Sequence, residues 1–447
     1  MELLSIDLWN VATMTDYRSG EEDPLFYGGT NGLLPYLTYG ATFDNSASFK
    51  SIYLTGQWID RRYFYIAQHY DYGLPTGDEY YGLPDGAVTA CGLDLFLQAD
   101  GIVALGAFTL PDREGYFPFL GKVTRELGLV TSFGDSATPG YAMLGPASGV
   151  RSVEALDRLV ARVTPDRIYI LAAGGASQPN QVICLDLQGR LDPAFNGTGM
   201  LDIIGQPPKD LHLQSLEIPE PYNRIILAGH EAAVAGAPPA GVFVGVTPDG
   251  TLDEGFGSGG FVYPATPVTG VEVLGTFLKH ALTWAVVAVG KGLADSKDSG
   301  LLMSVNQDGS QDIDFNGGQP LLLGDELGEL TWLRGAQDPR NGVIVGGYRL
   351  NPVNPNASLP AFGRIGVNGK FDATFGEGGV VTIRNQRYYP GTNRVLAMFV
   401  QTDNRVVVVG LVSQAGDRSF MLGYFLKDTV ILQPPAATGG DSPLTSA

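Results

Sequence analysis

Several short segments of the chain place an acidic residue three positions before an aromatic residue and a glycine, and carboxylates of this kind can bind cations. In one copy, Asp312-Ile-Asp314-Phe-Asn316-Gly317, the oxygen-bearing side chains are spaced as at the start of an EF-hand calcium loop. The twelfth position of such a loop requires a bidentate Glu, but here it is Leu323. We expect the repeated Asp to accept hydrogen bonds from turn amides, with calcium as the alternative. No other cofactor or metal is expected.

The sequence offers no recognisable catalytic motif. His230-Glu231 begins like a zinc-peptidase helix, but Val234 occupies the position of the second histidine. No nucleophile elbow, phosphate-binding loop or dinucleotide fingerprint is present. Carboxylates contributed by separate parts of the chain could still act as an acid and base pair, as in a glycosidase. We therefore assign no catalytic residues, and favour a non-enzyme while leaving an enzyme open.

Side chains suited to binding a sugar or a peptide occur where otherwise similar segments differ. Aromatic rings offer a flat amphipathic face, and arginine and aspartate form directional hydrogen bonds. The alternative for each aromatic ring is that it folds back into the local core. The candidate ligand-binding residues are Trp58, Asp60, Arg61, Asp112, Tyr348 and Arg349.

A repeat of about sixty residues organises the chain. The aromatic residues of the Asp-x-x-aromatic-Gly phrase lie at positions 26, 81, 133, 195, 256, 315 and 375, at spacings of 55, 52, 62, 61, 59 and 60. A second phrase, a β-branched run ending in glycine, recurs seven times at the same period, as in 224–229 and 405–410. Apolar runs that lead into Asp-Gly or Asn-Gly turns lie between them and are typical of hairpins.

About sixty residues accommodate four short strands and their turns, and a four-stranded sheet repeated radially is the blade of a β-propeller. The sequence therefore predicts an all-β, seven-bladed β-propeller, with a β-solenoid as the competing architecture. The last strand phrase, 419–426, has no Asp-aromatic-Gly phrase after it, whereas residues 23–29 supply one. We expect the N- and C-terminal strands to close the ring in one shared blade.

This interpretation makes residues 1–432 one propeller domain, of which 1–90 is the divergent first part. The segment 2–10 resembles a surplus strand with no assigned place, and 433–447 is expected to be a disordered tail. The segments directly after the β-run glycines are the least repetitive. They should emerge together on one face, where function usually resides on loops above a rigid scaffold.

Composition narrows the choice of partners. The chain has 28 basic and 47 acidic residues and a formal charge of −19, which disfavours nucleic acid and anionic membranes. No apolar run is long enough to span a bilayer. Cys91 and Cys184 lie in apolar strand-like runs and are expected to be buried free thiols, with a disulfide as the alternative. No Sec signal is visible, so we expect a cytoplasmic protein or export by a non-Sec route.

The segments 98–106 and 246–260 combine the phrases in a familiar order: an Asp-Gly turn, a β-branched strand ending in glycine, and Leu-Asp-x-x-Phe-Gly-x-Gly-Gly. In this order the chain resembles the delta-60 repeat of large bacterial proteins, closely from 117 to 427 and loosely before. The resemblance implies a bacterial source. It implies no catalytic residue set, because the family is defined by a structural repeat.

Strong scaffold repetition without catalytic motifs favours a non-catalytic binding module. The expected ligand is a carbohydrate or another protein, recognised through the loops of one face. Two alternatives remain: a hydrolase or lyase with its site on the propeller axis, and a structural or toxin-associated component of a bacterial assembly.

Overall fold

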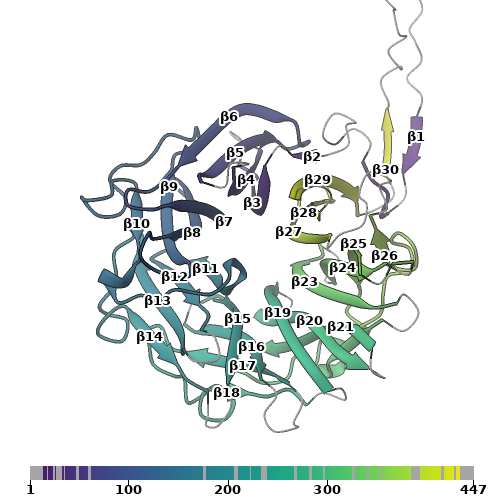
Figure 1. Cartoon of the computed structure of the whole chain (residues 1–447). Coiled ribbons are helices and arrows are strands. Elements are labelled where there is room, and N and C mark those ends of the chain that lie inside the picture. The colour runs from purple at the N-terminus through teal and green to yellow at the C-terminus, as the bar shows by residue number, and fades with distance from the viewer. Residues whose placement is uncertain are drawn as a thin grey trace, which may run out of the picture.

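The computed structural model describes residues 14–17, 19–23, 26, 33–34, 36–46, 50–58, 62–174, 178–205, 210–221, 223–232, 239–265, 269–280, 284–294, 297–324, 328–339, 342–351, 353–354, 356–383, 393–413, 417–426 and 429–432. Seven antiparallel four-stranded sheets stand as blades around a central axis (Figure 1). The prediction of an all-β, seven-bladed β-propeller is confirmed. No helix among the described residues is long and apolar enough to cross a membrane.

Blades 1 to 6 follow one another along the chain, and the strands of each are adjacent in sequence order. Blades 1 to 3 consist of β3 (Leu37–Asp44), β4 (Ser51–Gln57), β5 (Phe64–Tyr70) and β6 (Pro75–Gly82); β7 (Thr89–Gln98), β8 (Gly101–Thr109), β9 (Phe117–Val123) and β10 (Tyr141–Met143); and β11 (Leu159–Val163), β12 (Arg167–Ala172), β13 (Asn180–Asp186) and β14 (Met200–Ile203). Two short 3-10 helices, η2 (Pro146–Ser148) and η3 (Leu156–Arg158), join blades 2 and 3.

Blades 4 to 6 repeat this order. They consist of β15 (Leu211–Glu217), β16 (Ile225–Glu231), β17 (Ala240–Val246) and β18 (Phe261–Val262); β19 (Thr269–His280), β20 (Trp284–Ala294), β21 (Lys297–Asn306) and β22 (Leu321–Leu323); and β23 (Leu330–Gln337), β24 (Val343–Leu350), β25 (Ser358–Ile365) and β26 (Val380–Thr382). The 3-10 turn η4 (Asn316–Gly318) precedes β22.

Blade 7 joins the two ends of the chain, as predicted. Its three inner strands are β27 (Arg394–Val400), β28 (Arg405–Ser413) and β29 (Asp417–Phe425), and its outer strand is the N-terminal β2 (Leu33–Leu34). Leu33 pairs with Phe420, and Asp23 donates its amide to the carbonyl oxygen of Gly423 at 2.8 Å. A separate two-stranded ribbon of β1 (Met14–Tyr17) and β30 (Thr429–Leu432) lies beside the ring (Figure 1).

The β-branched runs form the second strand of each blade because that strand is covered on both faces. Val406, Val407, Val408 and Val409 of β28 are all inaccessible to solvent, since their side chains alternate between the two neighbouring blades. A strand buried on both faces reads as a continuous apolar run, and β-branched residues suit it.

The glycine that ends six of these seven runs lies opposite a β-bulge. In six of the seven described inner strands the register shifts by one residue, and the residue before the shift pairs with that glycine. At Gly229 and Gly290 an added Cβ would lie 2.0 and 1.9 Å from the carbonyl oxygens of His212 and Glu272. The repeat therefore retains glycine because the bulge leaves no room for a side chain.

The Asp-x-x-Phe-Gly phrase joins neighbouring blades. Residues directly after the aromatic ring donate their amides to the hairpin turn of the following blade: Asn196 to Asp249 at 2.7 Å, Asn316 to Val367 at 3.3 Å, and Gly376 to Ser19 at 3.0 Å. Because Ser19 belongs to the N-terminal segment packed on blade 7, ring closure uses the same contact as the other interfaces.

One of the seven predicted copies of this phrase is wrong. Six of the aromatic residues are buried in this turn, but Tyr81 lies in the outer strand β6, pairs with Tyr65 and is 40% exposed. Blade 1 instead joins β5 and β6 by a tight turn at 71–74, so it needs no such phrase. The surplus segment 2–10 and the tail 433–447 lie outside the described residues.

Candidate functional site

One face of the propeller carries the connections between the second and third strands of the blades, and we call it the loop face. The sequence predicted seven variable loops here, and the described parts of all seven segments lie between those strands or at their ends. Two of them are mostly strand rather than loop. Strands β20 and β21 continue through most of 291–298, and β28 and β29 through most of 411–418, because these residues extend their hairpins.

Trp58 lies on the loop face, but it is half buried in an aromatic cluster. Its ring centroid is 5.0 Å from that of Tyr36 and 4.8 Å from that of Tyr81. The hydroxyl groups of Tyr36 and Tyr81 both donate to the carboxylate of Glu79. Trp58 thus packs into the local core, which was the alternative to ligand binding for each candidate aromatic residue.

The other predicted binding residues are distributed over separate blades. Asp112 is exposed in the connection between β8 and β9. Tyr348 and Arg349 are half buried and lie in strand β24 rather than in a loop, because the β24–β25 hairpin extends to Leu350. Asp60 and Arg61 lie outside the described residues. The structure therefore does not gather the predicted residues into one site.

The repeated Asp residues are engaged by cations of the scaffold. Asp192 pairs with Arg167 at 2.9 Å, and Asp23 pairs with Arg405 at 2.8 Å. Asp253 and Asp372 also accept the backbone amide two residues ahead, at 2.9 and 3.0 Å. In several blades the cation also lies over the aromatic ring of the phrase, as Arg405 does over Phe26 at 5.5 Å. These contacts support the structural interpretation of the phrase.

Asp312, the copy with the calcium-like spacing, follows the same rule. Its buried carboxylate is 2.8 Å from the Lys279 ammonium and accepts a hydrogen bond of 2.6 Å from Ser304. Asp314 is exposed, and the side-chain amide of Asn316 donates to the backbone carbonyl oxygen of Gln319 at 3.0 Å. Among the described residues no group of three or more His, Cys, Asp or Glu side chains could hold a metal ion.

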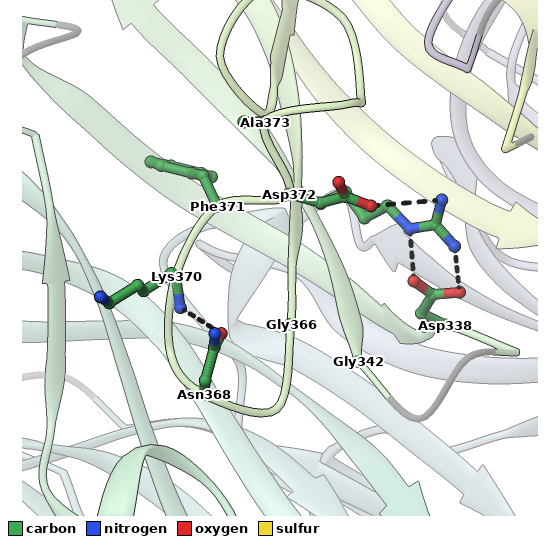
Figure 2. A pocket seen from close by; sticks show the side chains of 9 residues that line it. Asp338, Gly342, Gly366, Asn368, Lys370, Phe371, Asp372 and Ala373 are labelled. Carbon is green, nitrogen blue, oxygen red and sulfur yellow. Dashed lines mark hydrogen bonds and ion pairs between the residues drawn. The ribbon is translucent and has the colours of Figure 1, made fainter.

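A hollow of about 300 Å³ lies on the opposite face, between the two turns of blade 6 (Figure 2). At its edge the Arg364 guanidinium binds both carboxylate oxygens of Asp338 at 2.5 and 2.7 Å and lies 3.7 Å from Asp372. Arg364 and Asp338 are almost inaccessible to solvent. Arg364 is therefore satisfied by the protein itself, and the remaining cation of the lining is the exposed Lys370.

A convergence of charged and polar side chains lies instead at the propeller axis. We call it the axial cluster; it consists of Asp94 on β7, Arg162 on β11, Ser215 and Glu217 on β15, Thr276 on β19 and Arg334 on β23. The inner strands of five blades contribute these residues, and Figure 1 shows those strands surrounding the axis. Residues that are 55 to 240 positions apart in sequence thus influence one another electrostatically.

Most of the axial cluster is joined by short hydrogen bonds. Arg162 binds both oxygens of Glu217, at 2.6 and 3.0 Å, and lies 3.9 Å from Asp94. Thr276 donates to Glu217 at 3.0 Å and is 2.6 Å from the Ser215 hydroxyl. Burial alone would lower the pKa of Arg162, but the Glu217 carboxylate outweighs it and raises the pKa, so this guanidinium stays charged.

Arg334 differs from Arg162 because it forms no ion pair within 4 Å among the described residues, although the charge of Asp94 still acts on it. Its guanidinium is exposed to solvent, and its hydrogen bond is to the carbonyl oxygen of the preceding Leu333, at 2.9 Å. Burial among neighbouring protein groups lowers the pKa of Arg334; Asp94 opposes this shift, while Arg162 and Arg394 add to it by repulsion. Asp94 shows the converse effect, since burial raises its pKa against the attraction of Arg162.

No protein-family model matches the chain, and no curated protein matches it. Among solved structures, Drosophila Semaphorin 2a is 8% identical with a TM-score of 0.48, covering 94% of this chain and 77% of its own. A subtype N10 neuraminidase-like protein of A/little yellow-shouldered bat/Guatemala/060/2010 is 10% identical with a TM-score of 0.37, covering 73% of this chain and 93% of its own.

The sequence analysis missed the axial cluster because its members share no motif and no spacing. One signal was available. Asp94, Ser215 and Arg334 each occupy the position directly after the bulge that lies opposite a repeat glycine. The corresponding residues in blades 1, 5 and 7 are Gly40, Gly275 and Ala397. The repeat therefore fixes where this residue lies in the blade but not which residue type occupies it. This is expected where a site is built on a common scaffold.

Proposed function

We propose that this protein is a non-catalytic binding propeller that recognises a carbohydrate or another protein on its loop face, with the axial cluster as the anchor. The observation that carries the proposal is the meeting of Asp94, Arg162 and Arg334 from three inner strands at one axis. Polar groups that converge in a ring otherwise built of apolar strands are the default mark of a ligand site.

The division of labour within each repeat supports binding. In a typical repeat the Asp forms an ion pair, the aromatic residue lies in the turn that contacts the next blade, and the glycine lies opposite a bulge. These residues therefore serve the scaffold. Such a scaffold is rigid, and it leaves the loop-face connections and the positions after the bulges free to vary. A rigid ring that presents variable groups suits recognition, since little conformational entropy is lost on binding.

The carboxylates of the axial cluster favour binding over hydrolysis. Glu217 accepts two hydrogen bonds from Arg162 and one from Thr276, so both of its carboxylate oxygens are already occupied by the protein. A hydrolase or lyase remains the second candidate because of Asp94, whose pKa is raised by burial as in a general acid. Mass spectrometry of glycans incubated with wild-type protein and with Asp94→Asn separates the two, since turnover that Asp94→Asn abolishes supports the enzyme.

The experiment that tests the binding function is a glycan array with the purified chain, run with calcium and again with a chelator, together with affinity capture of protein partners. Tyr348→Ala and Asp112→Ala alter the loop face, and Tyr72→Ala is the matched control in the turn between β5 and β6 on the opposite face. Loss of binding by the loop-face variants alone supports the proposal. Binding that survives both, or that only Tyr72→Ala removes, contradicts the choice of face.

The delta-60 resemblance is proposed here on the repeat phrases alone. The period of about sixty residues and the turn phrase are supported by the role of each residue in the blades. A profile built from the six typical repeats should retrieve bacterial sequences of the same period. Retrieval of unrelated propellers with other periods would contradict both the family and the bacterial source.

A further inference from the structure

The outer strand of blade 1 differs from those of the other blades. β6 has eight residues, whereas the outer strands of the other six blades have two to four. Its one sheet neighbour among the described residues is β5, and five of its eight residues are exposed. Short outer strands are one means by which proteins prevent other chains from pairing with a sheet edge, and blade 1 lacks this protection.

The pairing of β5 shows which of its backbone groups point toward β6. The amide of Trp58 donates to the carbonyl oxygen of Tyr63 at 2.9 Å, so the backbone groups of Tyr63 point toward β4. Residues whose backbone groups point to one neighbouring strand and to the other alternate along an antiparallel strand. Those of Phe64 and Ile66 therefore point toward β6.

The same alternation identifies the free backbone groups of β6. The partners of the two residues that point toward it are Gly82 and Tyr80. The N–H and C=O groups of Glu79 and Tyr81 therefore point outward, away from the sheet. The register is regular over 79–82 and shifts below Glu79, so these four residues form the straight part of the edge. We call residues 79–82 the blade 1 edge; it lies on the outside of the ring (Figure 1).

Side chains hold the blade 1 edge in place on both faces. On one face the hydroxyl of Tyr80 is hydrogen-bonded to that of Tyr141 in blade 2. On the other face the hydroxyl groups of Tyr36 and Tyr81 donate to the carboxylate of Glu79. A strand fixed in this way loses little conformational entropy when another strand pairs with it.

The surroundings of the edge are acidic. Residues 63–112 contain seven Asp or Glu residues and no Lys or Arg. Asp78 and Glu79 are exposed in β6, and Asp85, three residues after the strand, is exposed as well. A second copy of this chain would bring the same acidic residues to the same edge, and a formal charge of −19 on each copy adds to the repulsion. A basic segment is attracted instead.

Two exposed side chains of the edge can receive cations. On an added strand, the residues opposite Glu79 and Tyr81 direct their side chains to the face that these two share. Each carboxylate oxygen of Glu79 has a second lone pair beyond the one used by a tyrosine, so it can also accept from a cation. A cation opposite Tyr81 would lie at the face of a ring that is 40% exposed.

We propose that the blade 1 edge binds an extended basic segment of a partner protein as an added β-strand, with basic residues at alternate positions. Strand addition supplies affinity through the outward backbone groups of Glu79 and Tyr81, and the alternate basic side chains supply specificity. This inference goes beyond the proposed function, because the outer edge of blade 1 belongs neither to the axial cluster nor to the loop-face residues proposed to bind a ligand.

The test is titration calorimetry of the whole protein with a capped peptide of alternating arginine and threonine. It should bind at least about tenfold more tightly than the same peptide with glutamate in place of arginine. A third peptide is N-methylated at its arginine amides, the amides that face the edge in the proposed pairing. It keeps its charge but cannot donate these hydrogen bonds, so it should lose at least about tenfold in affinity.

Variants of the edge separate the backbone from the side chains. Tyr81→Pro removes an amide that points outward, so the blade keeps its own hydrogen bonds while the added strand loses one. Its affinity should fall at least about tenfold, and more than that of Tyr81→Ala, which loses the ring but keeps the amide. Glu79→Gln should weaken binding about tenfold. Glu254→Gln, the same charge change in an exposed turn of blade 4, should bind like wild type.

Three results would overturn the inference. Equal affinity for the methylated and unmethylated basic peptides would mean charge attraction without strand pairing, and this comparison uses wild-type protein, so it holds even if Tyr81→Pro fails to fold. Self-association in sedimentation that Tyr81→Pro abolishes would assign the edge to a second copy. No measurable binding of the basic peptide would remove the site. All three leave the loop-face function standing, because its test relies on Tyr348 and Asp112.

Discussion

Gly347 of β24 lies opposite Trp332 of β23 at the bulge of blade 6, and a Cβ on this glycine would lie 1.9 Å from the carbonyl oxygen of Thr331. We predict that Gly347→Ala lowers the free energy of unfolding by about 1–3 kcal/mol, since backbone on both sides must shift. Gly145→Ala is the control, because its nearest neighbour is a ring atom at 3.7 Å and its φ is −109°. Equal stability of the two variants in urea denaturation would contradict the bulge argument.

The buried pair of Arg364 and Asp338 should be more sensitive than any exposed pair. Asp338→Ala leaves the Arg364 guanidinium buried without its main counter-charge, so we expect a loss of about 3–5 kcal/mol in the free energy of unfolding. In the matched exposed pair, Arg151 and Asp202 are 38% and 39% accessible. Asp202→Ala should therefore cost about 1 kcal/mol or less. A comparable loss in both variants would argue against a special role for the buried pair.

The repeat made the fold predictable because each of its residues has a local task. The glycine after each β-branched run is required by a bulge, and the turn phrase by a contact with the next blade. Tyr81 misled the alignment because its surroundings imitate the phrase while its strand continues in the sheet.

The axial cluster was not predictable in the same way. Arg162 binds Glu217 across two blades, and nothing in either neighbourhood indicates the other. This ion pair depends on how the inner strands β11 and β15 of neighbouring blades pack, which only the three-dimensional arrangement shows. The packing of Trp58 was unpredictable for a related reason, since its neighbours Tyr36 and Tyr81 come from other parts of the chain.

Both cysteines should be inert in the native protein. Cys91 and Cys184 are buried free thiols, as predicted, and burial raises the pKa of Cys184 to about 12. The thiolate is the reactive form, so we expect no modification by a disulfide reagent at pH 8 under native conditions. Two thiols per chain should react after unfolding in denaturant. Rapid reaction of a folded thiol would show that its blade opens locally.

Trp58→Ala should act on stability more than on recognition. The ring packs on Tyr36 and Tyr81 and against the core of blade 1, so its removal should lower the free energy of unfolding by about 2–3 kcal/mol, somewhat less than for a fully buried tryptophan. Thermal unfolding followed by circular dichroism measures this. Unchanged stability combined with lost ligand binding would instead show that Trp58 is a binding residue.

His230 should make the protein less stable as the pH falls. Its ring stacks on His212 at 5.5 Å, and burial together with the neighbouring His212 lowers the pKa of His230 to about 4. The unfolded chain takes up this proton near pH 6.5, so the native state binds fewer protons between about pH 6.5 and 4. The contribution of His230 is therefore complete above pH 6.5. It declines by up to about 1.4 kcal/mol for each pH unit below that value.

Denaturant unfolding of wild type and His230→Phe at pH 7.5 and at pH 5 isolates the contribution of His230 protonation to stability. The phenyl ring keeps the stacking on His212 but cannot bind a proton. Arg158 and His212 are the charged and titratable groups nearest to the ring, and both are retained in the variant. The variant should lose less stability than wild type over this interval, by on the order of 1–2 kcal/mol. Identical losses in the two proteins would mean that His230 already titrates normally in the folded ring.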